Sequence, residues 1–117
     1  MKYLVAVATY SGENIDLHFG HCSEFQVIEV TNNESWEVTG SIEAGRACDG
    51  QCNHDYIGDV AQKLKECRYV LSAKIGPGAA QIVRNIGPVP LEIEAPVDYA
   101  IGKLMTYDNR RENANRN

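Results

Sequence analysis

Histidine and cysteine, the soft metal-binding side chains of this sequence, are concentrated in two short segments. The first segment contains His18, His21 and Cys22, and the second contains Cys48, Cys52 and His54. Each segment includes glycine, which is typical of a loop that a ligand can reach. Imidazole and thiolate suit zinc, copper, iron or an iron–sulfur cluster, whereas magnesium and calcium prefer oxygen ligands. The sequence therefore predicts a soft-metal or metal-cluster site.

In the first segment, His18-Phe19-Gly20-His21-Cys22, each donor also has a structural interpretation. His18 could end a turn while Phe19 anchors the loop in the core, and His21 could simply face solvent. Cys22 could be a small buried side chain at the start of a strand, the usual fate of a free cysteine. Because three donors lie so close together, ligation and the structural interpretation both stay open.

The second segment is a weaker signal, because Cys48 and Cys52 form a single Cys-x3-Cys pair. Structural zinc usually takes two such pairs, so the remaining ligands would come from His54 or from the first segment. The same cysteines could instead form a reversible disulfide, as in a thiol redox protein, or stay unligated. A zinc module and a thiol redox protein therefore remain alternatives. Cys67 lies apart and continues the apolar face of a predicted helix, so we expect it in the core.

A third motif, Gly76-Pro77-Gly78, directly precedes a predicted helix. Free backbone N–H groups and the positive end of the helix dipole would suit an anion there, and Lys74 could add a positive charge. The motif lacks the Gly-Lys-Ser/Thr of a phosphate loop, which argues against a nucleotide. A tight turn explains the same glycines. No pair of carboxylates has a spacing typical of acid–base chemistry, so we do not expect an enzyme.

Composition excludes several function classes. The chain has 117 residues, of which 44% are hydrophobic and 23% charged, with a formal net charge of −5. This length predicts one domain over residues 1–107, followed by a disordered polar tail over residues 108–117. The negative charge argues against nucleic acid as a partner. No segment has the length of a membrane span, and the apolar start lacks a signal-peptide pattern, so we expect a cytoplasmic protein.

The elements that must position these motifs follow from hydrophobic periodicity. Strands are predicted at residues 2–9, 24–31, 36–43, 69–73 and 89–93, and helices at residues 57–64, 79–86 and from 96 onward. The short turn at Asn32-Asn33-Glu34 makes the second and third strands a hairpin, and prolines mark the last strand as an edge. The order is βββαβαβα.

This order predicts a five-stranded mixed sheet with strand order 3-2-1-4-5 and helices on both faces. The first three strands form an antiparallel meander, and right-handed crossovers make the remaining strands parallel. The loops at residues 10–23, 43–53 and 74–78 then emerge at one end of the sheet. Ligands of open α/β sheets bind at such an end, so we expect both donor segments to meet there.

Several stretches resemble one known family, that of the nitrogenase accessory proteins that bind the iron–molybdenum cofactor or its precursors, which includes NifX-type carriers and the carboxyl-terminal domain of NifB. The matching stretches are 5–8, 16–22 with Phe25, 67–71, 74–79 and 97–101. The resemblance implies a three-layer α/β/α, ribonuclease-H-like fold. It also implies a stand-alone carrier without a radical-enzyme domain, which would not itself assemble a cofactor.

The resemblance also implies a site and a cargo. His18 becomes the leading ligand of an iron–sulfur or iron–molybdenum-type cluster, with Gly20, His21 and Cys22 beside it. The glycine loop with Lys74, Gly76 and Gly78 would cradle the charge of the cluster. Cluster-donating and cluster-accepting proteins would be the partners. The pair Cys48 and Cys52 is common only in some stand-alone members, so no role carries over to it.

Overall fold

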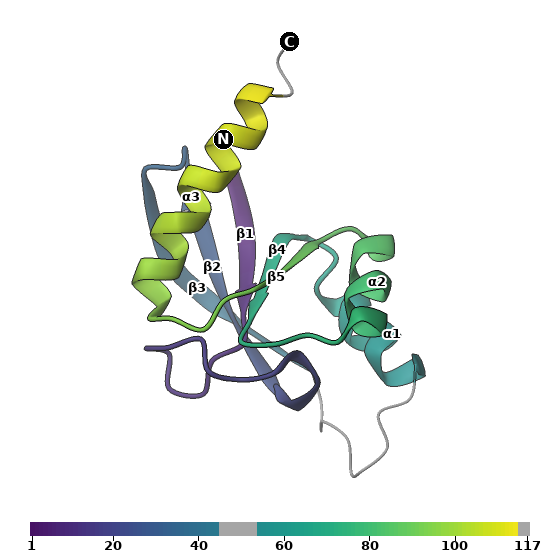
Figure 1. Cartoon of the computed structure of the whole chain (residues 1–117). Helices are drawn as coiled ribbons and strands as arrows, with labels where there is room; N and C mark the ends of the chain where they lie inside the picture. Colours follow the sequence, from purple (N-terminus) through teal and green to yellow (C-terminus); the bar gives the residue numbers. More distant parts are fainter. Residues whose placement is uncertain (45–53, 115–117) are drawn as a thin grey trace.

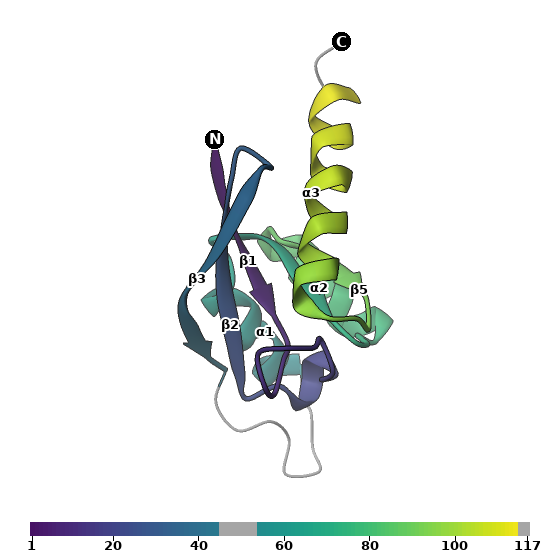
Figure 2. The same cartoon turned by 90° about the vertical axis from the view of Figure 1, so that its left-hand side faces the viewer.

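The fold is a five-stranded mixed sheet with helices on both faces. The structure, a computed structural model, describes residues 1–44 and 54–114. Its elements are β1 (Lys2–Val7), a 3-10 turn (Phe19–His21), β2 (Glu24–Thr31), β3 (Ser35–Glu43), α1 (His54–Lys63), β4 (Cys67–Ser72), α2 (Pro77–Ile86), β5 (Val89–Glu92) and α3 (Val97–Ala114). Figures 1 and 2 show α3 on one side of the sheet, and α1 and α2 on the other.

The strand order is β3-β2-β1-β4-β5, which confirms the predicted topology. β1 pairs antiparallel with β2, and β2 pairs antiparallel with β3. β1 pairs parallel with β4, and β4 pairs parallel with β5. The hairpin turn also forms as expected. Asn32 and Asn33 have φ angles of 55° and 53°, the left-handed conformation that a tight hairpin turn requires and that asparagine tolerates.

The alternation of side chains along the strands divides the core into two layers. The layer beneath α1 and α2 includes Ala6, Phe25 and Val70. The layer beneath α3 includes Val5 and Tyr69. The helical faces predicted from spacing are buried in these layers, at Ile57, Val60 and Ala61 in α1 with Leu64 directly after it, and at Val97, Ala100, Ile101 and Leu104 in α3. Each helix is therefore held to the sheet by its apolar stripe.

The prediction of a disordered tail from residue 108 is wrong for residues 108–114, because α3 continues to Ala114. The tail was predicted from its polar composition, but these polar side chains make specific contacts. Asp108 is only 2% exposed, and no apolar periodicity reveals such a residue. Among the described helices, none combines the length and apolar character needed to cross a bilayer.

The contacts of Asp108 form a polar network between α3 and the sheet. Its carboxylate accepts a hydrogen bond of 2.6 Å from the Tyr69 hydroxyl, one of 3.0 Å from the Asn33 amide and two of 3.1 and 3.2 Å from Arg68. Arg111 donates to the Tyr69 hydroxyl at 3.0 Å. Burial opposes ionisation of Asp108, but the hydrogen bonds from Tyr69, Asn33 and Arg68 outweigh it and lower its pKa.

Candidate functional site

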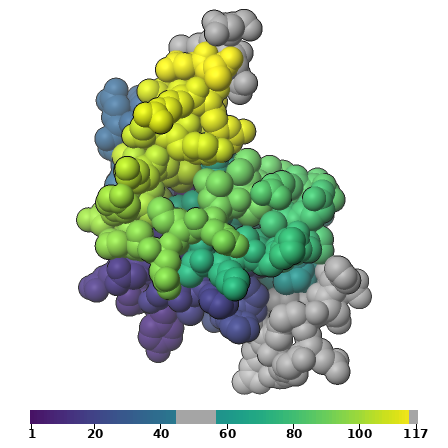
Figure 3. Space-filling view, viewed as in Figure 1, coloured from purple at the N-terminus to yellow at the C-terminus, as the bar shows by residue number. Residues whose placement is uncertain are grey.

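Two of the three predicted loops meet at the carboxyl end of the sheet. β1, β3 and β4 all end at this edge, as their registers show. The loop after β1 runs beside the start of the loop after β4: Ala73 N–H donates to the Leu17 carbonyl at 3.0 Å, and Phe19 N–H donates to the Lys74 carbonyl at 2.9 Å. In the space-filling view, the purple loop lies directly beneath the green β4–α2 region (Figure 3).

A short 3-10 turn holds the two histidines of the first segment. Phe19 opens the turn, is 2% exposed and packs against Phe25 with ring centroids 5.5 Å apart. This anchor is apolar, so it is stable without using either imidazole. His18 and His21 are exposed, and the His18 side chain makes no hydrogen bond that caps the turn. Phe19 therefore anchors the loop, as expected, while both imidazoles stay accessible to a ligand.

The two imidazole rings lie side by side. Their centroids are 5.8 Å apart, and their planes differ by 12°. A single zinc ion binds nitrogen at about 2.1 Å, so two ligands of one ion must bring their nitrogens close to a common point. Both imidazoles line one pocket and lie close enough together to bind one ligand.

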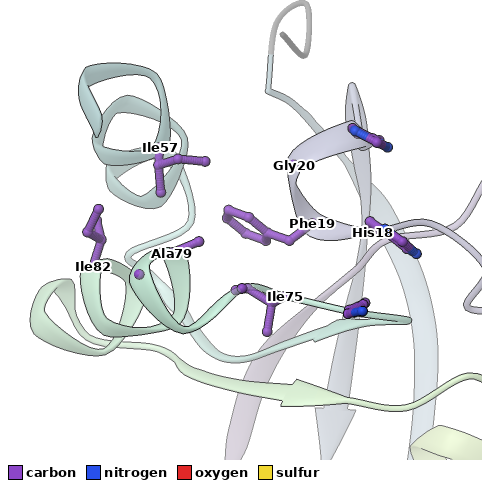
Figure 4. Close-up of a pocket in the computed structure, with 11 residues that line it drawn as sticks. His18, Phe19, Gly20, Ile57, Ile75, Ala79 and Ile82 are labelled. Atoms are coloured by element: carbon purple, nitrogen blue, oxygen red, sulfur yellow. The ribbon is translucent and has the colours of Figure 1, made fainter. Parts of the chain in front are cut away.

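The histidine turn forms one wall of a pocket of about 410 Å³. The lining residues are His18, Phe19, Gly20, His21, Ile57, Lys74, Ile75, Gly76, Gly78, Ala79 and Ile82. Figure 4 shows Ile57, Ala79 and Ile82 on one side of Phe19, and His18 on the other. The pocket thus has an apolar half made by α1 and α2 and a polar half made by the two loops.

The amino end of α2 contributes to the polar half. Gly76 is the N-cap and makes no side-chain capping bond, and Pro77 occupies the first helical turn. The first backbone N–H groups of a helix have no partner within the helix, and they lie at the positive end of its dipole. A Cβ added at Gly76 or Gly78 would meet nothing within 4 Å, so the backbone here borders open space. Together with Lys74, this end of α2 gives the pocket a positive character.

Cys22 lies close to the histidines in sequence but does not line the pocket. Its side chain is 1% exposed, and its thiol donates to the Glu24 carbonyl at 3.2 Å. Burial raises its pKa to about 11, which keeps it in the thiol form. Cys67 is buried in the core, as predicted, and burial raises its pKa to about 11 as well. The structure thus brings together His18, His21 and Lys74 but leaves Cys22 outside.

The second donor segment falls largely outside the described residues. Cys48 and Cys52 belong to residues 45–53, and His54 begins α1 with a side chain that is also not described. Within residues 1–44 and 54–114, no group of three histidine, cysteine, aspartate or glutamate side chains could hold a metal ion. A zinc site or a redox pair that uses these cysteines therefore stays an untested prediction.

Four apolar lining residues have sequence patterns that predict structural roles rather than a place in the site. Phe19 was expected as an anchor, and Ile57, Ala79 and Ile82 as members of core-facing stripes. Ile57, Ala79 and Ile82 lie in the part of each apolar helical face that is nearest the loops. This position could have indicated that they line the pocket, because that end of each helix borders the ligand-binding edge of the sheet.

Comparison with known proteins identifies the family. The model of the family described as dinitrogenase iron-molybdenum cofactor matches residues 1–107. The chain belongs to this family. The FeMo cofactor biosynthesis protein NifB of Frankia alni is 31% identical over 106 residues, which cover 86% of this chain and 20% of NifB. Protein NifX of Herbaspirillum seropedicae is 32% identical over 103 residues, covering 86% of this chain and 69% of NifX.

This member of the iron–molybdenum cofactor family spans about a fifth of the length of the NifB relatives that it matches. Solved structures share its fold. A putative dinitrogenase from Methanocaldococcus jannaschii aligns with a TM-score of 0.57 and 13% identity over 91% of this chain and 90% of that one. A second solved structure aligns with a TM-score of 0.62 and 19% identity over 88% of each chain. The three-layer α/β architecture expected from the resemblance is thereby confirmed.

Proposed function

We propose that this chain binds an iron–sulfur cluster, of iron–molybdenum type or a precursor of it, as a cargo that it carries and releases without catalytic turnover. The observation that carries the proposal is the convergence of two accessible imidazoles, Lys74 and the uncapped amino end of α2 on one pocket. Membership in the iron–molybdenum cofactor family supports the choice of cargo.

In this proposal His18 is the primary ligand and His21 the neighbouring one. Imidazole nitrogen is a suitable ligand for iron, and both rings line the same pocket 5.8 Å apart. Both side chains are exposed, so ligand exchange with an accepting protein does not require the core to open. A carrier with few protein ligands can release its cargo, in contrast to a closed four-ligand cage.

The remaining lining residues match the other properties of such a cluster. Lys74 and the backbone of Gly76–Gly78 would offset its negative charge. The apolar half of the pocket, with Ile57 and Ile82, would pack against bridging sulfides, which are weak hydrogen-bond acceptors. The partners in this proposal are proteins that donate the cluster to the chain and proteins that accept it.

Binding is tested under strictly anaerobic conditions with a synthetic thiolate-capped [4Fe–4S] cluster, followed by desalting, metal analysis and visible absorption. We expect wild type to retain iron and broad visible absorbance, and the H18A variant to lose about 90% of both. Tyr10 is 87% exposed in the same loop and does not line the pocket, so Y10A serves as the matched control. Retention of the cluster by H18A at the wild-type level would reject His18 as the primary ligand.

The positive half of the pocket is tested in the same way with K74Q. Lys103 lies on α3, outside the pocket, so K103Q is its control. Removal of one charge near an anionic cluster should weaken binding several-fold at low salt and less at high salt. Equal binding by K74Q and K103Q at low salt would show that Lys74 does not contribute.

A further inference from the structure

One peptide group connects the two loops that form the polar half of the pocket. The peptide between Lys74 and Ile75 is held at both of its polar atoms. Its carbonyl accepts a hydrogen bond from Phe19 N–H at 2.9 Å. Its N–H donates to the Glu92 carboxylate at 3.1 Å. The histidine turn and the side chain of Glu92 are thus joined through a single planar group.

Glu92 itself does not line the pocket. It is the last residue of β5, and its carboxylate reaches the backbone one residue before Gly76, the N-cap of α2. The backbone of β5 approaches the same region, because Ile93 N–H donates to the Ser72 carbonyl at 2.8 Å. The carboxylate therefore contacts the pocket lining through the backbone N–H of Ile75.

The bond has two physical effects on the loops. A carboxylate is a strong acceptor, and its hydrogen bonds are stronger than those between neutral groups. A peptide whose N–H is bonded in this way becomes a better acceptor at its carbonyl, because hydrogen bonds in a chain polarise one another. The bond from Phe19 N–H to the Lys74 carbonyl should therefore be strengthened by Glu92, and with it the placement of His18 and His21.

We propose that Glu92 is a positioning residue for the cluster pocket, which it acts on by holding the Lys74–Ile75 peptide between the histidine turn and the amino end of α2. The inference rests on the proposed function for the identity of the ligand. The arrangement of the peptide does not depend on that ligand, so the two claims can be tested separately.

The first measurement uses the protein without ligand. Amide hydrogen exchange by NMR is compared in wild type, E92A, E92Q and E94A, where Glu94 is exposed like Glu92 and lies just beyond β5. We expect exchange at Ile75 and Phe19 to become about tenfold faster in E92A, and to stay within about threefold of wild type in E92Q, whose amide oxygen still accepts. E94A should match wild type. Unchanged exchange at both amides in E92A would overturn the proposal.

The second measurement is the affinity for the synthetic [4Fe–4S] cluster. We expect about tenfold weaker binding by E92A, with most of the affinity restored in E92Q. A simple loss of repulsion between Glu92 and an anionic cluster would instead strengthen binding in both variants, which would contradict the proposal. Faster exchange with unchanged affinity in E92A would overturn the role in the pocket. If wild type binds no cluster, the proposed function fails, while the exchange data still decide whether Glu92 holds the peptide.

Discussion

The buried carboxylate of Asp108 provides a sharp test of how α3 is attached to the sheet. Replacing it by alanine removes the acceptor for Tyr69, Asn33 and Arg68 in one step. The Tyr69 side chain is fully buried, so its hydroxyl has no direct contact with solvent in the folded chain. The Arg68 side chain is 34% exposed and also lies 3.5 Å from Glu112, so it recovers part of its solvation.

These contacts determine how much stability the D108A variant should lose. An unsatisfied buried hydroxyl costs about 1–3 kcal/mol. The loss of the Asp108–Arg68 ion pair adds a further cost, which is reduced because the Arg68 side chain is partly exposed to solvent. We expect D108A to lower the free energy of unfolding by about 3 kcal/mol. For a domain of this size, that corresponds to a melting temperature lower by about 12 °C. The assays are thermal and urea unfolding, with D59A at an exposed position of α1 as the control.

The same network predicts a pH dependence. The pKa of Asp108 is lower in the folded chain than its ordinary value of 3.8, so the folded state favours the carboxylate more than the unfolded state does. Its contribution is fully present above that ordinary value and is lost as the pH falls through the lower folded pKa. The difference in stability between wild type and D108A should therefore shrink below about pH 4. A difference under about 0.5 kcal/mol at pH 7, or one that is equal at pH 7 and pH 2, would refute this reasoning.

Two further predictions concern the pocket and the thiol beside it. Ile82 and Ile86 are both partly buried on α2 against the same core layer, but only Ile82 lines the pocket. I82N should weaken binding of the synthetic cluster about tenfold more than I86N does, and equal losses would show that the apolar half does not touch the ligand. The pKa of Cys22 is raised to about 11 by burial, so an NMR titration of its Cβ should show no thiolate at pH 8. A midpoint below pH 9 would contradict its burial.

The layout of the sheet was predictable from sequence because few sheet topologies are compatible with the order βββαβαβα. Alternation and apolar runs located the strands, and the right-handed crossover rule placed β4 beside β1. The convergence of the loop after β1 with the loop after β4 followed from that order alone. His18, His21, Lys74, Gly20, Gly76 and Gly78 belong to these two loops, and all six line one pocket, while their role as ligands stays a prediction.

The polar contacts were not predictable, because each depends on residues far apart in the chain. Asp108 and Tyr69 are 39 positions apart, and a polar helix end alone is typical of a disordered tail. Glu92 had the pattern of an outward residue on an edge strand, and its bond to the backbone of Ile75 depends on how β5 ends beside α2. Cys22 follows His21 directly, yet it leaves the 3-10 turn with an extended backbone and its side chain is buried in the core.

Ligation of the cargo by His18 can be observed by pulsed electron paramagnetic resonance on the reduced, cluster-loaded chain with ¹⁵N-labelled histidine. We predict hyperfine couplings from imidazole nitrogen in wild type and in the Y10A control, and loss of the His18 coupling, with at most that of His21 left, in the cluster that H18A retains. An unchanged set of imidazole couplings in H18A, or no imidazole coupling in loaded wild type, would show that His18 is not a ligand.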